Sequence, residues 1–164
     1  MHRVLLSVLL SLVLVAAGSS VALALQSGGV EIGDLETGSV IGQPFKTLDV
    51  DLEFYSMKVG EKKAWYPPTA ILNLTREGTG ARAGRPILIK VTNTLDTEHG
   101  FDLSADTAFA GPTSLHVQLV LKPGETKYIG IPISDLTYVT ASNTLRYKCH
   151  LHAAHLGGQL LVLR

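Results

Sequence analysis

The chain has 164 residues, of which 46% are hydrophobic and 17% are charged, with 14 basic and 14 acidic side chains. This length and composition fit one globular domain with a sizeable core. The formal net charge of zero gives no overall basic field to hold nucleic acid, so we do not expect a nucleic-acid partner. The single cysteine, Cys149, cannot form an internal disulfide, which excludes a small disulfide-stapled scaffold.

The N-terminus has the pattern of a leader. An apolar run over residues 4–16 follows Arg3 and precedes the small-residue segment Ala22-Leu23-Ala24. This order is typical of a secretory signal peptide. We therefore expect a signal peptide over residues 1–24, a mature domain over residues 25–164, and a periplasmic or secreted protein. An uncleaved leader that anchors the chain in a membrane is the alternative, although the run is short for a spanning helix.

The first element after the leader is predicted between Phe45 and Phe54. Apolar and acidic residues alternate there, which predicts a half-buried strand. The two sides of this strand are Leu48, Val50, Leu52 and Phe54 on one, and Asp49, Asp51 and Glu53 on the other. We expect the acidic side to be solvated, with docking of a redox partner as the alternative.

Short apolar runs separated by turn residues predict further strands along the rest of the chain. These runs lie at 70–74, 86–91, 115–121, 128–133, 145–149 and 159–163. The segments Gly78–Gly84 and Lys122–Glu125 predict connections, and only Ser134–Tyr138 suggests a short helical turn. Many short strands without a helical period predict an all-β sandwich or barrel.

The strongest chemical signal lies near the C-terminus. Three of the six histidines, His150, His152 and His155, fall within six residues of Cys149. The surrounding residues predict a strand that ends at the cysteine and a tight loop that presents the imidazoles. A thiolate with imidazoles selects copper or zinc over hard cations. A further imidazole should come from a distant strand, and His99, which follows a strand and a polar loop, is the candidate.

This arrangement resembles the split copper site of the cupredoxin family. The likeness is carried by Asn93, then His99-Gly-Phe101, and some fifty residues later by Cys149-x-x-His152 followed by an apolar strand. It spans roughly residues 70–164, with residues 31–55 supplying early strands. The resemblance implies a cupredoxin-like Greek-key β-sandwich that binds one copper ion per chain.

Within the family, the likeness is nearest to the red copper proteins. The segments that carry it are Cys149-His-Leu-His152, His155-Leu-Gly-Gly158 and Lys122-Pro-Gly-Glu-Thr-Lys127. Those proteins have a glutamate ligand just before the Gly-Phe pair, where this chain has His99, and their loop histidines are two residues further apart. We therefore do not expect the open, carboxylate-bearing site here.

The resemblance also assigns the ligands. His99, Cys149 and His152 are the three strong ligands, and His155 stands where short-loop family members carry an axial methionine. Because imidazole binds Cu(II) more strongly than a thioether does, we expect a tetragonal site with a lower potential than an axial methionine would give.

Other residues near the predicted site have alternative roles. Gln159 is a second axial candidate, and Glu98 is a third if the strand slips by one residue, although adjacent strand residues face opposite sides. We expect His150 to point away from the metal into solvent, with electron entry or a transient second metal as lesser options. His116 and Trp65 are expected to be structural.

The predicted site favours an electron carrier over an enzyme. Copper would cycle between Cu(II) and Cu(I), and the partner would be a soluble or membrane-bound redox protein. The alternatives are an open copper site for small-molecule binding or catalysis, and copper delivery or storage. Zinc is another possible occupant. A Cys-His hydrolase fits less well, because its base usually lies far from the cysteine in sequence, whereas these histidines are local.

Overall fold

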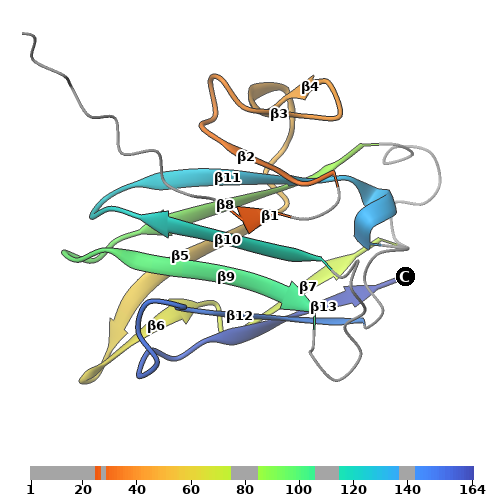
Figure 1. The fold of residues 1–164 in the computed structure, drawn as a ribbon. Coiled ribbons are helices and arrows are strands. Elements are labelled where there is room, and N and C mark those ends of the chain that lie inside the picture. The colour runs from red at the N-terminus through yellow and green to blue at the C-terminus, as the bar shows by residue number, and fades with distance from the viewer. Residues whose placement is uncertain (1–24, 27–28, 75–84, 106–114, 137–142) are drawn as a thin grey trace, which may run out of the picture.

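The structure, a computed structural model, describes residues 25–26, 29–74, 85–105, 115–136 and 143–164 (Figure 1). The expected signal peptide over residues 1–24 and the connection at Gly78–Gly84 lie outside these residues. In the part of the chain that is described, no helix has both the length and the apolar character needed to cross a membrane.

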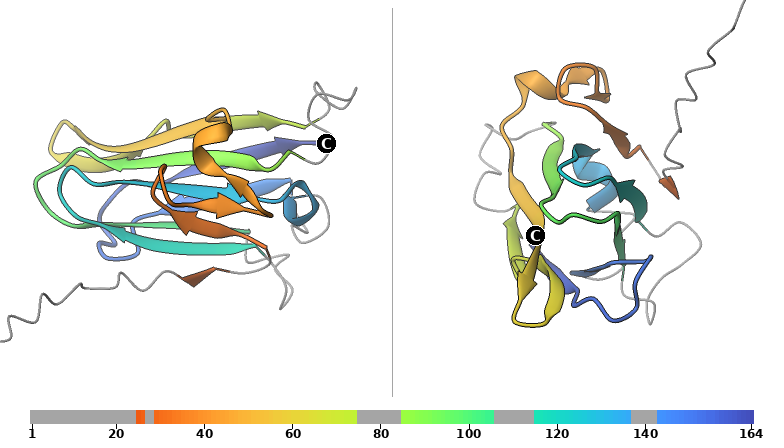
Figure 2. Two further views of the ribbon diagram at one scale, coloured as in Figure 1. Left: turned by 90° about the horizontal axis from the view of Figure 1, so that it is seen from above. Right: turned by 90° about the vertical axis from the view of Figure 1, so that its left-hand side faces the viewer.

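Two β-sheets pack face to face, which confirms the predicted all-β sandwich (Figures 1 and 2). The first sheet has the order β1 (Leu25–Gln26), β10 (His116–Leu121), β9 (His99–Ala105), β12 (Thr144–Lys148), β13 (Gly158–Leu163) and β7 (Thr69–Asn73). The second has the order β2 (Glu31–Gly33), β11 (Thr126–Ile131), β8 (Ile87–Asn93), β5 (Leu52–Val59) and β6 (Lys62–Tyr66). A small ribbon of β3 (Ser39–Val40) and β4 (Gln43–Pro44) precedes the short 3-10 helix η1 (Phe45–Thr47).

The connections between the sheets are of the Greek-key kind. β9 and β10 form an antiparallel pair in the first sheet, and the chain then returns so that β11 pairs antiparallel with β8 in the second. Of the four consecutive strands β8 to β11, the first and the last are therefore paired in one sheet and the middle two in the other. The consequence for function is that the start of β9 and the end of β12 meet as antiparallel neighbours, although they are far apart in sequence.

The strand sequences explain the layering. In β10, residues alternate between half-buried and fully buried positions, as expected for a strand with one face on the core. In β8 nearly every residue is buried, because a second apolar cluster covers its outer face. That cluster consists of Val40, Phe45, Leu48 and Leu88. The segment from β2 to η1 therefore serves as a cover over the second sheet.

The predicted strand from Phe45 to Phe54 is wrong in its first half. Phe45 lies in η1 and fills the second apolar cluster, and Val50 is 38% exposed. The ladder begins only at Leu52, where β5 starts to pair in parallel with β8. Asp49 and Glu53 are solvated as expected, with side chains that are 89% and 57% exposed, and they also pair with Arg85 and Lys90.

Most other predicted strands are confirmed, within about two residues at their ends. Within the described residues, the helical turn expected at Ser134–Tyr138 is matched by a short helical segment over residues 133–136, and residues 137–138 lie outside them. The predictions omitted β1, β6 and β9. The structure also shows an aromatic layer under one end of the sandwich, in which Phe101 packs 5.0 Å from Trp65 and 5.4 Å from Phe54 between ring centroids.

Candidate metal centre

Two buried residues at one end of the first sheet form the base of the candidate site. His99 is the first residue of β9, and Cys149 follows directly after β12. Because Lys148 of β12 pairs with Asp102 of β9, the two strand ends lie next to each other at the left-hand end of Figure 1. His99 is 1% exposed and Cys149 is 4% exposed. The sheet therefore holds an imidazole and a thiol side by side, away from water.

The structure brings all four predicted ligands together. His99, Cys149, His152 and His155 each place one ligand atom so that all of these atoms lie within 4.8 Å of one another. The cysteine Sγ lies 3.4 Å from His152 Nδ1 and 3.9 Å from His99 Nδ1. Two ligand atoms on one ion, at typical metal–sulfur and metal–nitrogen bond lengths, are separated by about 3.5 Å in tetrahedral geometry. The arrangement therefore fits a shared metal ion.

The loop that carries His152 and His155 is fixed at both ends. Within the loop, the backbone N–H of His155 donates to the carbonyl of His152 at 3.1 Å. Leu156 then joins β6, because its N–H donates to the Lys63 carbonyl at 2.9 Å and its carbonyl accepts from Trp65 at 3.0 Å. These bonds tie the loop to the second sheet, so the imidazoles have little freedom to leave the cluster.

A glycine allows the loop to return to the first sheet. A Cβ on Gly157 would lie 2.2 Å from the carbonyl oxygen of Tyr147 on β12. The Cα of Lys148 would lie 3.2 Å away as well, so the backbone of β12 leaves no room for such an atom. The sequence therefore needs glycine at this position for the loop to close tightly beside Cys149.

A buried asparagine organises the chain before His99. Asn93 is fully buried, and its amide Nδ2 donates to the carbonyls of Thr97 at 2.7 Å and of Leu121 and Lys122 at 3.1 Å. Its Oδ1 accepts from the Ser56 hydroxyl at 2.7 Å and from the Leu95 N–H at 3.1 Å. The hydrogen bonds of the buried Asn93 side chain thus stabilise the loop over residues 94–98, and this loop fixes the position of His99.

The second ring nitrogen of His99 has its own partner. His99 Nε2 lies 3.2 Å from the hydroxyl of Thr97, which also accepts a hydrogen bond from Lys63 Nζ at 2.9 Å. If His99 binds a metal ion through Nδ1, its proton lies on Nε2, which then donates to the Thr97 oxygen. His99 Nδ1 is the ring nitrogen on the side of the Cys149 sulfur. Such outer partners are the usual means of orienting metal-binding imidazoles.

The electrostatics keep the imidazoles available as ligands. Burial, assisted by the nearby His155 and Lys63, lowers the pKa of His99 to about 4. Burial also lowers the pKa of His155, with His152 and Lys63 contributing. Both rings are therefore neutral at neutral pH, as metal binding requires. His155 Nδ1 is buried without a hydrogen-bond partner among the described residues, and a metal ion would satisfy it.

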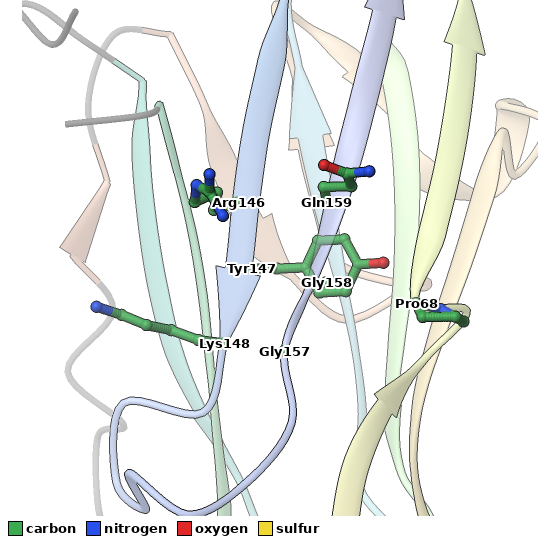
Figure 3. A pocket seen from close by; sticks show the side chains of 7 residues that line it. All are labelled: Pro68, Arg146, Tyr147, Lys148, Gly157, Gly158 and Gln159. Atoms are coloured by element: carbon green, nitrogen blue, oxygen red, sulfur yellow. The ribbon is translucent and has the colours of Figure 1, made fainter. Parts of the chain in front are cut away.

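The alternative fourth ligands lie elsewhere. Gln159 lines a groove of about 430 Å³ together with Pro68 and Arg146, and none of the four clustered ligands lines it (Figure 3). Glu98 is exposed, as expected for the neighbour of an inward-facing strand residue. Neither belongs to the group of four convergent side chains.

Of the remaining histidines, His150 departs from expectation. His150 is only half-exposed instead of solvated, and its ring packs on Gly100, where an added Cβ would lie 2.5 Å away. His116 lies 3.3 Å from the carboxylate of Asp102 on the outer face of the first sheet. Trp65 is buried and donates from its indole N–H to the Gly100 carbonyl at 3.0 Å, which fits the expected structural role.

The fold and the cluster together define a β-sandwich protein with three imidazoles and one thiol converging at one end. No family model matches the sequence, and no curated protein matches it.

Several solved structures of copper proteins are similar to the chain. One is a reduced auracyanin from the photosynthetic bacterium Roseiflexus castenholzii, with a TM-score of 0.47 and 17% identity over 71% of this chain and 98% of that chain. Auracyanin A, a blue copper protein from Chloroflexus aurantiacus, has a TM-score of 0.44 and 16% identity over 67% and 95%. The Cu(I) form of an amicyanin mutant has a TM-score of 0.45 and 12% identity over 85% and 97%. At these values, the functional assignment depends on the geometry of the cluster itself.

Proposed function

We propose that this protein is an exported cupredoxin that binds one copper ion through His99, Cys149, His152 and His155 and acts as an electron carrier. The observation that carries the proposal is the convergence of one thiol and three imidazoles within 4.8 Å. One sulfur and several nitrogen ligands suit copper and zinc, and a His2Cys set with a further axial ligand is typical of electron-transfer copper. Bound copper would supply a one-electron couple between Cu(II) and Cu(I).

The protein residues would keep the ligand positions constant during that change. His99 is held by its strand and by Thr97, and the loop histidines are held by the backbone bonds of residues 155 and 156. A ligand set fixed in this way resists rearrangement when the charge of the ion changes. Burial of His99 and Cys149 keeps water away from the inner side of the cluster.

The outer side of the cluster offers a route to a partner. His152 is exposed, and the same loop carries two leucines, Leu151 and Leu156, that are each 44% exposed. An exposed ligand in a loop with exposed leucines would let a redox protein approach a metal-bound ring closely. We infer that a soluble or membrane-bound redox protein docks over this loop, in the periplasm or outside the cell.

The related alternative is an open copper site like that of nitrosocyanin, a red copper protein with a similar loop sequence. That site needs a carboxylate ligand, whereas Glu98 is exposed and outside the cluster. Copper delivery or storage is a second alternative, and the exposed position of His152 is the observation that favours it.

The test is copper loading followed by optical and electron paramagnetic resonance spectroscopy. Protein without a tag is titrated with Cu(II), and the same titration is run on Cys149→Ser and, as a control, on Gln159→Ala. We expect an intense thiolate-to-copper charge-transfer band that saturates at one equivalent, vanishes in Cys149→Ser and persists in Gln159→Ala. Reversible reduction would support the carrier, whereas rapid loss of copper to a chelator would indicate delivery. Absence of the band with tight zinc binding would overturn the copper proposal.

A further inference from the structure

Lys63 of β6 contacts both segments that carry the predicted ligands. Its carbonyl accepts from the Leu156 N–H at 2.9 Å, at the end of the loop that follows Cys149. Its ammonium Nζ donates to the Thr97 hydroxyl at 2.9 Å, in the loop that leads into His99. Figure 1 shows β6 beside the first of these loops, where Leu156 bridges to the strand. One residue of the second sheet therefore joins the two halves of the site.

The protein holds the Lys63 ammonium in place without neutralising it. Lys63 is half-buried, and within the described residues it forms no ion pair with a carboxylate. Its hydrogen bond goes to the Thr97 hydroxyl, which is a neutral group and lies 3.2 Å from His99 Nε2. The neighbouring Lys62 is exposed and, as the adjacent residue of a strand, faces the opposite side. A positive charge is therefore fixed one hydroxyl group away from a ligand.

The Lys63 charge reaches more than one imidazole of the cluster. Burial is the main cause that lowers the pKa of His99 and of His155, a neighbouring imidazole comes second, and Lys63 comes third in both cases. Asp96 raises the pKa of His99, but its contribution is the smallest. The fixed charges around the cluster therefore leave a net positive field at the ligand atoms.

We propose that Lys63 makes this site select monovalent Cu(I) over divalent ions such as Zn²⁺. The inference rests on the ligand set of the proposed function and deepens it. One thiolate and three neutral imidazoles carry a single negative charge, so bound Cu(I) leaves the site neutral and a divalent ion leaves it positive. A fixed positive charge nearby repels a positive site and not a neutral one, so it weakens the binding of divalent ions.

The experiment compares the affinities of the site for Cu(I) and for Zn²⁺. Tag-free protein competes with a chromophoric chelator without oxygen, once for Cu(I) in the presence of a reductant and once for Zn²⁺. Lys63→Met removes the charge, and we expect the ratio of the Cu(I) affinity to the Zn²⁺ affinity to fall about fivefold, the size expected for one unit charge in partly solvated surroundings. Lys63→Arg keeps the charge and should keep this ratio within about twofold.

Lys62→Met is the matched control, because it removes the same charge from the next residue of the same strand, on the opposite side. It should change the ratio by less than about twofold, because salt and water screen an exposed charge. The difference between the native protein and Lys63→Met should shrink when the salt concentration rises from about 0.02 M to about 0.5 M. Lys63→Gln removes the charge but keeps a donor, and it answers the same question if Lys63→Met does not fold.

The outcomes separate this proposal from the proposed function, because the chelator reports binding without any charge-transfer band. An unchanged ratio in the charge-removing variants, or an equal change in Lys62→Met, would overturn the role of Lys63 even in a protein whose copper is reversibly reduced. A shift in Lys63→Arg as large as in Lys63→Met would attribute the effect to the hydrogen bond and would overturn it as well. The expected shift in a protein without the band or reversible reduction would exclude the electron carrier and retain the Cu(I) selectivity.

Discussion

The two imidazoles that face the Cys149 sulfur differ in almost every physical respect. His99 is 1% exposed, begins a central strand and has a hydroxyl on its second nitrogen. His152 is exposed and lies in a loop. The cluster therefore has two halves. The buried half, which contains His99, fixes the geometry of the site, and the exposed half, which contains His152, is accessible to other molecules. If this division is correct, damage to the two halves should have different consequences.

The largest difference is expected when each imidazole is removed in turn. His152→Gly should lose the charge-transfer band, and free imidazole should restore it, because the vacated position opens to solvent. His99→Gly should also lose the band, but imidazole should not restore it, because the vacated space is enclosed by the core. The measurement is the band intensity of copper-loaded variants against imidazole concentration. Equal rescue of both variants would contradict the division.

The buried half depends on the Asn93 hydrogen bonds. Asn93→Ala should lower the free energy of unfolding by about 3 kcal/mol, because several buried donors and acceptors lose their partner at once. It should also weaken copper binding, because the loop before His99 loses its support. Urea denaturation of the apo protein measures the first effect. Asn143→Ala, at an exposed position, is the matched control and should change stability by less than about 0.5 kcal/mol.

The loop half depends on its close return beside β12. Gly157→Ala should cost about 2 kcal/mol, because the new Cβ meets the Tyr147 carbonyl and backbone must move. Gly60→Ala is the control for the substitution itself. It places a Cβ in open space but at a positive φ, so it should cost about 1 kcal/mol through the backbone alone. Only Gly157→Ala should also broaden the copper spectrum. An unchanged spectrum would mean that the loop holds its histidines without this contact.

The exposed half was the more predictable from sequence. Three histidines lie within six residues of the only cysteine, and this spacing predicts a metal site without any knowledge of the fold. The strand predictions succeeded where one face is buried, as in β10, because alternation then appears directly in the sequence.

The buried half was harder to predict. β9 was missed because it buries polar residues, including His99 and Asp102, on both of its faces. These polar residues interrupt the run of apolar residues by which a buried strand is recognised in a sequence. β6 was missed because it begins with Lys62 and Lys63, which give no sign of the ladder with β5. The contacts of Asn93 reach residues 28 and 29 positions away. Such long-range contacts depend on the topology, which no local pattern reveals.

The smallest effect on stability is expected for an ion pair on the second sheet, because this pair is partly exposed to solvent. Lys127 on β11 lies 2.9 Å from Asp34 and 3.4 Å from Glu125, and the hydrogen bond to Asp34 is the main cause that raises the Lys127 pKa. Because Asp34 is 61% exposed, solvent screening should limit the pair to less than about 1 kcal/mol.

The pH dependence of this pair has a definite sign. A raised pKa means that the folded state holds the proton more strongly than the unfolded state, so the stabilisation is complete below the ordinary pKa of 10.5 and is lost as the pH rises through the folded pKa. Lys127→Met should therefore be less stable than the native protein at pH 8, and the difference should shrink near about pH 11.5. Urea denaturation at both pH values measures it. A difference that grows at high pH would contradict the assignment of the stabilisation to the charged amine.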